Sequence, residues 1–304
     1  MRRVIWRLVW PGVLLWPLLV ACAWLGPAAA PTPTPTCTAS PTSTSTSTAT
    51  PSPTSSPTNT PTPTPEPTPT PRGHLQVVVI LHGPSRFLQV DRVLAENDAS
   101  SIPVLAYAGD EIPDLTEFDA VILSGGEYPP SEFDEVPFLQ RERDRVMEAI
   151  DSEVPVLGIC LGHQLLVHWL GGRVEKSSEF EVGWLELDVN QDGLEDPLLQ
   201  GIGPRFYTFL WHWDQVTQLP PGGVNLASST LTAIQIFRYR ALPVWGVQGN
   251  PQYTPPLAES ALLGAQWLAD MGLDAREMAS RGYEVEDGSQ DQLFRNFFAY
   301  VRTH

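Results

Sequence analysis

The sequence contains few basic residues and few cysteines. Its 304 residues include 18 Lys and Arg against 35 Asp and Glu, so the formal net charge is −17. A surface this acidic disfavours nucleic acids and anionic lipids as partners, because both carry negative charge themselves. The three cysteines, Cys22, Cys37 and Cys160, each fall in a different part of the chain and do not form a disulfide framework. We assign no metal and no cofactor to the chain.

Residues 31–71 lack any hydrophobic side chain larger than Ala apart from Cys37, and Pro, Thr and Ser fill 36 of these 41 positions. Such a segment has nothing to bury that would offset the entropy cost of ordering it. Alternating Pro and Thr favour an extended polyproline II conformation, which reaches roughly 3 Å per residue. We therefore expect residues 22–73 to form a disordered stalk rather than a domain.

The N-terminus has the composition of an export signal. Three arginines precede an uncharged run of 14 residues, 8–21, which is shorter than the about 20 residues that span a membrane as a helix. The run ends in Leu-Val-Ala-Cys at 19–22, which resembles the lipobox of bacterial lipoproteins. The resemblance implies a signal peptide at 1–21, cleavage before Cys22 and a lipid on that cysteine. The alternatives are an ordinary signal peptide or an uncleaved short anchor.

A lipid on Cys22 would place the protein outside the cytoplasm, anchored to the bacterial cell membrane or envelope. Diacylation plus a further acyl chain gives stable attachment, where one chain would be marginal. Loss of the three signal-peptide arginines leaves 15 basic against 35 acidic residues, a net charge of −20.

Residues 74–304 are enough for one well-buried α/β domain. Apolar runs predict buried strands at 75–81, 102–106, 120–123 and 154–159, and helical periodicity predicts helices at 87–97 and 137–150. On the first helix, one face is expected to carry Phe87, Val90, Val93 and Leu94. Alternating strands and helices indicate a doubly wound, mostly parallel sheet with helices on both faces. Ligands of such sheets bind beyond the carboxyl ends of the strands.

One predicted strand ends in a glycine-rich turn that carries a cysteine. Gly158 and Gly162 stand two residues before and two after Cys160, and an apolar helix follows. This spacing is typical of a nucleophile elbow, in which the reactive side chain sits at a helix N-terminus. The helix dipole there favours the thiolate, and the Leu161 N–H is placed to stabilise an oxyanion. The alternative is a small core cysteine in a tight turn.

A second strand end runs into Ser124, Gly125 and Gly126, where the glycines let backbone N–H groups approach a ligand. With PVLGICLGHQLL at 155–166, this segment resembles the class I glutamine amidotransferase domain. The resemblance continues through GGRV at 171–174, EVGW at 181–184, WHWDQV at 211–216 and LASS at 226–229. These later segments are most similar to the stand-alone branch related to the amidotransferase domain of GMP synthase. The resemblance implies a flavodoxin-like fold.

The resemblance implies roles for individual residues. Cys160 would attack a glutamine side-chain amide and form a thioester, while the N–H groups of Gly126 and Leu161 stabilise the oxyanion. Gln164 would lie beside the substrate. His212 and Asp214, in a loop before a strand, would flank the pocket.

Each of these assignments has a structural alternative. Gln164 could simply cap or pack its helix, and His212 could be a structural residue in a Trp-rich loop. His163 and His168 lie on the helix after Cys160, and we expect neither to face the thiol. His82 follows the first strand, where its imidazole could line the same cleft.

The sequence departs from the family at the catalytic base. The family has Gln-Phe-His-Pro-Glu after its last strand, where His is the general base and Glu orients it. Here the aligned residues are Gln-Gly-Asn-Pro-Gln at 248–252, so Asn250 replaces the His and Gln252 replaces the Glu. An amide does not titrate near neutrality and can neither deliver nor remove a proton. The two amides could instead hydrogen-bond to each other and keep the loop shaped.

Three hypotheses follow. The first is a non-catalytic or impaired glutaminase-type domain that binds a small amide or carboxylate ligand outside the cytoplasm. The second is an active hydrolase that uses Cys160 with another base, His212 or His82. The third is a surface module for protein contact or oxidant sensing, with Trp211 and Trp213 as candidate exposed contacts. A tethered domain outside the cell would also lack the ATP and the synthase partners that amidotransferases serve.

The family resemblance covers residues 76–255. Beyond it, the sequence predicts two helices at 257–271 and 290–301, joined by an acidic loop. We expect these helices only to cover the sheet.

Overall fold

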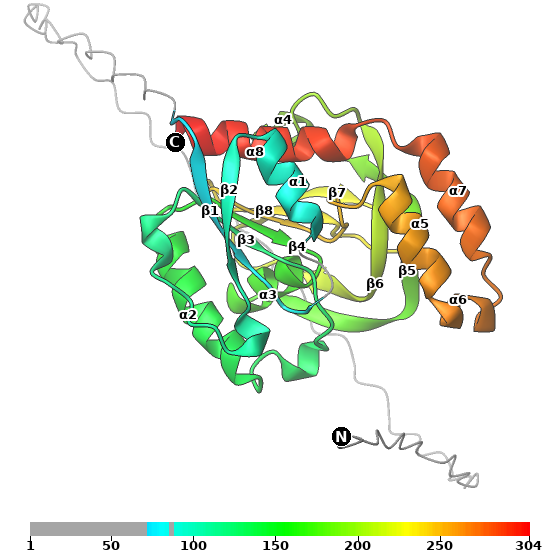
Figure 1. Ribbon diagram of the computed structural model, residues 1–304, viewed down its shortest axis with the longest axis horizontal. Helices are drawn as coiled ribbons and strands as arrows, with labels where there is room; N and C mark the ends of the chain where they lie inside the picture. Colours follow the sequence, from blue (N-terminus) through cyan, green and yellow to red (C-terminus); the bar gives the residue numbers. More distant parts are fainter. Residues whose placement is uncertain (1–71, 85–87) are drawn as a thin grey trace, which may run out of the picture. The chain divides into compact units, whose positions relative to one another are not determined.

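The computed structural model describes residues 72–84 and 88–304 (Figure 1). The predicted signal peptide, the stalk, Cys22 and Phe87 lie outside the described residues. Among the residues that are described, no helix is long and apolar enough to cross a membrane.

A nine-stranded sheet organises the described part of the chain, in the order β2-β1-β3-β4-β9-β8-β7-β5-β6. Four neighbouring pairs are parallel and four are antiparallel, so the sheet is mixed and the prediction of a mostly parallel sheet was wrong. The parallel half consists of β1 (Leu75–Ile80), β2 (Ala99–Val104), β3 (Ala120–Leu123), β4 (Val156–Ile159) and β9 (Val244–Val247). The antiparallel half consists of β5 (Arg173–Val189), β6 (Arg205–Gln218), β7 (Gly223–Ser228) and β8 (Ile236–Tyr239).

Helices cover both faces of the parallel half, as predicted (Figure 1). Successive side chains of a strand point to opposite faces, so Val77 and Val79 of β1 join one core while Val78 and Ile80 join the other. The first core is covered by α1 (Leu88–Glu96) and α8 (Ser289–Thr303). The second is covered by α2 (Pro137–Asp151) and α3 (Leu161–Trp169).

The edge strand β2 begins three residues earlier than the sequence predicted. It begins at Ala99 and pairs with β1 from its first residue, and a 3-10 turn (Ala106–Ala108) follows it. The added residues include two serines, which give no apolar signal. An edge strand can carry them because one side faces no neighbouring strand. Other 3-10 turns lie at Leu115–Glu117, Pro130–Glu132 and Pro197–Leu199.

The C-terminal segment contains more helices than predicted. In place of two helices and an acidic loop it forms α5 (Pro255–Gly264), α6 (Gln266–Asp270), α7 (Ala275–Val285) and α8. Earlier in the chain, a short helix, α4, spans Gln191–Glu195. Asp274 begins α7 by accepting hydrogen bonds from the backbone N–H groups of Arg276 and Glu277. The helix packs closely on the sheet, because a Cβ at Gly282 would lie 2.3 Å from Trp184 Nε1. Of the acidic residues in the predicted loop, Glu277 and Glu284 thus lie on a helix, while Asp274, Glu286 and Asp287 flank it.

The long strands β5 and β6 form an antiparallel ribbon that reaches past the parallel strands (Figure 1). Its register places Glu181 opposite His212 and Lys176 opposite Asp214, with an irregularity between the two pairs. His212 and Asp214 therefore lie within β6, and their placement in a loop before a strand was wrong. The charged and polar residues in this stretch hid the strand, because its pairing and not its apolar pattern defines it.

Candidate active site

Cys160 occupies a strand-to-helix turn between β4 and α3, and the predicted elbow geometry is confirmed. Its backbone has φ 53° and ψ −103°, a left-handed φ that non-glycine residues adopt rarely. The flanking glycines permit the turn. A Cβ at Gly158 would lie 2.5 Å from the Gly162 carbonyl oxygen, and one at Gly162 would lie 2.5 Å from the Leu123 carbonyl oxygen. The turn thus requires both glycines.

Two glutamines connect the thiol to the ribbon. Cys160 is 5% exposed, and its Sγ lies 4.0 Å from the Trp211 carbonyl oxygen and 3.9 Å from Gln248 Nε2. Gln164 Nε2 donates to Gln248 Oε1 at 3.1 Å and to the Asp214 carbonyl oxygen at 2.9 Å. Gln164 is therefore linked to Cys160 through Gln248 and joins α3 to β6.

The loop after β3 lies against the start of α3. The Gly162 N–H donates to the Ser124 carbonyl oxygen at 3.1 Å. A Cβ at Gly126 would lie 2.6 Å from Leu161 Cδ2 and 2.7 Å from His82 Cβ, so the loop packs too closely for a side chain there. Leu161 is the first residue of α3, and its N–H has no acceptor within the helix. Gly126 and Leu161, the residues whose N–H groups were predicted to stabilise an oxyanion, thus pack against each other.

The position of the family's base holds a pair of buried amides. Asn250 is 0% and Gln252 2% exposed, and Gln252 Nε2 donates to Asn250 Oδ1 at 3.3 Å. A Cβ at Gly125 would lie 3.5 Å from Asn250 Oδ1 and 3.4 Å from Cys160 Cβ, so the Asn250 side chain lies beside the cysteine. Asn250 Nδ2 and Gln252 Oε1 have no hydrogen-bond partner among the described residues. The mutual hydrogen bond that the sequence suggested is present.

His212 is held in a network of its own. Its Nδ1 bonds to the Asp214 carbonyl oxygen at 3.0 Å, and its Nε2 lies 3.1 Å from Glu181 Oε2. Glu181 also accepts hydrogen bonds from Ser229 Oγ and Gln235 Nε2, both at 2.6 Å. Burial raises the pKa of Glu181, but hydrogen bonds led by the one from His212 outweigh it and leave the pKa lowered. Both ring nitrogens of His212 are therefore engaged away from Cys160.

His82 lies behind the Gly126 loop and does not line the pocket, which was one position that the sequence allowed for it. It is 2% exposed, its Nδ1 bonds to the Ser124 carbonyl oxygen and its Nε2 to Glu142 Oε1, each at 2.8 Å. Burial by itself lowers the pKa of His82, but the charge and hydrogen bond of Glu142 and the Ser124 carbonyl raise it above its usual value. The imidazole lies behind the loop because Glu142, a buried carboxylate on α2, binds its Nε2.

The two histidines of α3 also avoid the thiol, as expected. His163 is fully buried against Phe237, and burial lowers its pKa to about 3. His168 Nε2 lies 3.0 Å from Asp134 Oδ1 at the other end of the helix. The contacts that these four histidines make are with groups other than Cys160.

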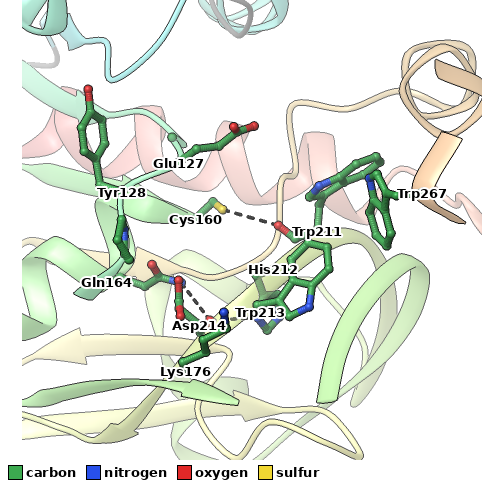
Figure 2. Close-up of a pocket in the computed structure, with 12 residues that line it drawn as sticks. Glu127, Tyr128, Cys160, Gln164, Lys176, Trp211, His212, Trp213, Asp214 and Trp267 are labelled. Atoms are coloured by element: carbon green, nitrogen blue, oxygen red, sulfur yellow. Dashed lines mark hydrogen bonds between the residues drawn. The ribbon is translucent and has the colours of Figure 1, made fainter. Parts of the chain in front are cut away.

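A pocket of about 450 Å³ opens above Cys160 (Figure 2). Its polar lining includes Gln164, His212 and Asp214, which confirms that these predicted residues gather around one cavity. Burial raises the pKa of Asp214, against the opposing charges of Lys176 and His212, and its Oδ1 has no hydrogen-bond partner among the described residues. The other lining residues are Gly126, Glu127, Tyr128, Pro129, Lys176, Trp211, Trp213 and Trp267.

Sequence reasoning did not single out several of these residues, including Lys176 and Trp267. Lys176 is the single lysine of the chain, a signal that could have drawn attention to it, yet only its pairing with Asp214 across the ribbon brings it to the pocket. Trp267 lies on α6, in the segment to which we assigned no role beyond covering the sheet. Trp211 and Trp213, expected to be exposed contacts, are partly buried and pack with Trp267.

Comparison with known proteins agrees with this geometry. Residues 85–268 match the family model of class I glutamine amidotransferases. The chain is 33% identical over 175 residues to a subunit of the glutamine-hydrolysing GMP synthase of Methanococcoides burtonii, covering 57% of this chain and 80% of the relative.

Solved structures show the same fold. A glutamine amidotransferase from Thermotoga maritima superposes with a TM-score of 0.68 at 24% identity, covering 77% of this chain and 100% of that one. A GMP synthase subunit from Thermoplasma acidophilum superposes with a TM-score of 0.54 at 22% identity, covering 76% and 95% of the two chains.

Proposed function

Because the chain belongs to the class I glutamine amidotransferase family, we propose that it binds a small amide or carboxylate ligand in the inherited pocket and hydrolyses it poorly or not at all. The observation that carries the proposal is the amide pair of Asn250 and Gln252 beside Cys160. Thioester chemistry needs a proton delivered to the departing ammonia and later removed from water. Neither amide can do this.

The surroundings of Cys160 support the loss of a base rather than its replacement. His212 and His82 are the two alternative bases, and both ring nitrogens of each already have protein partners. Recruiting either one would require breaking at least one of these contacts, with a buried carboxylate at Nε2 or with a backbone carbonyl at Nδ1. A binding role fits the site better than hydrolysis with a substitute base.

The polar groups that remain are suited to recognising a ligand. Backbone N–H groups of Gly126 and Leu161 can donate to an amide carbonyl, and Gln164 is fixed beside them by two hydrogen bonds. The exposed side chain of Lys176 at the pocket can pair with a carboxylate. Together they fit a molecule with an amide at one end and a carboxylate at the other.

We further propose that this pocket lies outside the cytoplasm, on a protein tethered by a lipid at Cys22. The basic N-terminus, the Leu-Val-Ala-Cys run at 19–22 and the Pro/Thr-rich segment after it support this location. A tethered pocket without a base would serve to capture a ligand at the cell surface and not to supply ammonia to a synthase. No protein partner is needed for this role.

Calorimetric titration of the purified chain with L-glutamine and with glutarate tests the proposal. We expect saturable binding of at least one of them, with a Kd of about 1 mM or below. Lys176→Met should weaken binding about two- to fivefold, as expected for one exposed ion pair, whereas Arg173→Met on the same strand should leave it unchanged. Absence of binding by either compound at millimolar concentrations would show that the pocket has another role.

A further inference from the structure

One side of the pocket is a wall of three indoles. Trp211 and Trp213 come from β6 and Trp267 comes from α6, and Figure 2 shows them gathered opposite Tyr128 and Gln164. The ring centroids of Trp267 lie 5.8 Å from those of Trp211 and 4.8 Å from those of Trp213. All three side chains are partly exposed.

The wall is supported from behind. Phe180 on β5 packs against Trp213 with ring centroids 5.1 Å apart and against Trp267 at 5.7 Å. Trp211 also packs against Phe209, at 6.0 Å. Because each ring is held by others, the wall is formed before any ligand arrives, and a ligand that uses it pays little for ordering side chains.

Amide and carboxylate recognition leaves this wall unused. The donors of the Gly126 loop, Gln164 and Lys176 account for the amide and carboxylate groups of a glutamine-like ligand. The only apolar groups of glutamine are two methylenes, which are too small to cover three indole rings. Partly exposed aromatic side chains in a pocket are the usual means of binding a flat apolar group, and a cavity of about 450 Å³ is within the range of drug-sized ligands.

The position of the wall shows which end of the ligand would meet it. The Trp211 carbonyl oxygen lies 4.0 Å from Cys160 Sγ, so the wall begins beside the thiol. It then continues to Trp213 and Trp267, away from the strand end that carries Cys160. A ligand whose amide lies at Cys160 would therefore present its remote end, the end that carries the α-amino and carboxylate groups in glutamine, to these two rings.

We propose that the ligand is a glutamine-like amide whose remote end carries an aromatic ring, and that Trp267 determines this preference. The inference rests on the proposed function, since it names the class of ligand for the same pocket. It also gives the C-terminal helices a role in specificity, because α6 supplies the ring that completes the wall.

Three matched compounds test the inference by calorimetric titration of the purified chain. L-Glutamine carries no substituent, N-α-acetyl-L-glutamine has a small acyl group, and N-α-benzyloxycarbonyl-L-glutamine has an aromatic ring joined through a similar acyl nitrogen. The last two share the loss of the ammonium charge, so their difference reports the benzyloxy group, whose largest part is the ring. We expect the benzyloxycarbonyl compound to bind about tenfold more tightly than the acetyl compound.

Variants assign the preference to the wall. Trp267→Ala should reduce the ratio of the two affinities to about threefold or less, and Trp267→Phe should retain most of it. Leu263→Ala is the matched control, because Leu263 lies on α5, is 47% exposed and does not line the pocket. Trp267 is partly exposed at a short helix, and equal thermal melting of the variants would show that they remain folded.

The outcomes separate the two proposals. If glutamine or the acetyl compound binds but the ring adds no affinity, or if the preference survives in Trp267→Ala, this inference is wrong and the proposed function stands. If none of the three compounds binds, this inference fails, and the proposed function fails with it if glutarate does not bind either.

Discussion

Restoring the family's base should restore its reaction if the amide pair is what silences the site. The double substitution Asn250→His and Gln252→Glu places an imidazole and its orienting carboxylate where two buried amides now bond to each other. The nucleophile turn, the Gly126 loop and Gln164 are already in place. The wild type should show no Cys160-dependent release of ammonia from glutamine, and the double variant should show it.

The structure allows the size of the change to be worked out. Loss of one member of a catalytic triad costs about three to six orders of magnitude, or about 4 to 8 kcal/mol of transition-state stabilisation. The larger imidazole must fit a site where Asn250 is fully buried, at a cost of about 1–3 kcal/mol. Removal of the two unpaired amide atoms returns a similar amount, because each buried unpaired polar group costs about 1–3 kcal/mol. The double variant should therefore fold, and its rate should exceed that of the wild type by at least about a thousandfold.

The assay is ammonia release from glutamine, measured across pH. The restored rate should rise with pH through about 6.5, the ordinary pKa of a histidine that must be neutral to act as a base. Adding Cys160→Ala to the double variant should abolish the rate, and each single substitution should recover less than the pair. A wild type that already releases ammonia through Cys160, or a folded double variant that binds glutamine and stays silent, would refute the reasoning.

Two further predictions concern the scaffold. Glu142→Gln removes the carboxylate that raises the pKa of His82, so the free energy of unfolding should fall by about 3–5 kcal/mol. Because the folded-state pKa of His82 is raised, its contribution to stability is complete below about pH 6.5 and is lost as the pH rises through the folded-state pKa. Urea denaturation should therefore find the largest deficit at acidic pH, and a deficit that grows with pH would contradict this. Gly158→Ala places a Cβ 2.5 Å from the Gly162 carbonyl oxygen and should lower the melting temperature sharply. The control Gly83→Ala meets no atom within 4 Å and should change the free energy of unfolding by less than about 0.5 kcal/mol. Equal effects of the two substitutions would argue against the packing of the turn.

Local sequence signals predicted the elements that depend on local spacing. The strand at 75–81, the strand Ala120–Leu123 and the helix from Pro137 appear within one or two residues of their predicted bounds. The Cys160 turn was predictable for the same reason, since the two glycines that permit it stand within four residues of each other. A tight turn depends on residues that are close together in the chain, so the sequence predicts it directly.

Residues brought together by long-range pairing were the ones that local reasoning misplaced. His212 and Asp214 were expected in a loop because strand β6 is defined by its ladder with β5 and not by an apolar pattern. His82 follows a strand that ends at the pocket, yet a carboxylate 60 residues later in the chain, Glu142, holds its ring behind the loop. Neither partner can be read from the residues nearby.

By itself, the sequence determined the family, the place of Cys160 in its turn and the presence of amides at the aligned position of the family's base. Each depends on residue identity at fixed spacing: Cys160 between its glycines, and amides at 250 and 252 in a register marked by Gln248 and Pro251. Only the tertiary structure decided what surrounds that cysteine. Lys176 and Trp267 reach the pocket from segments separated by about 90 residues, because a strand register and a helix position place them there. Residue spacing along the chain can predict a turn, but a pocket wall forms only when distant segments pack together.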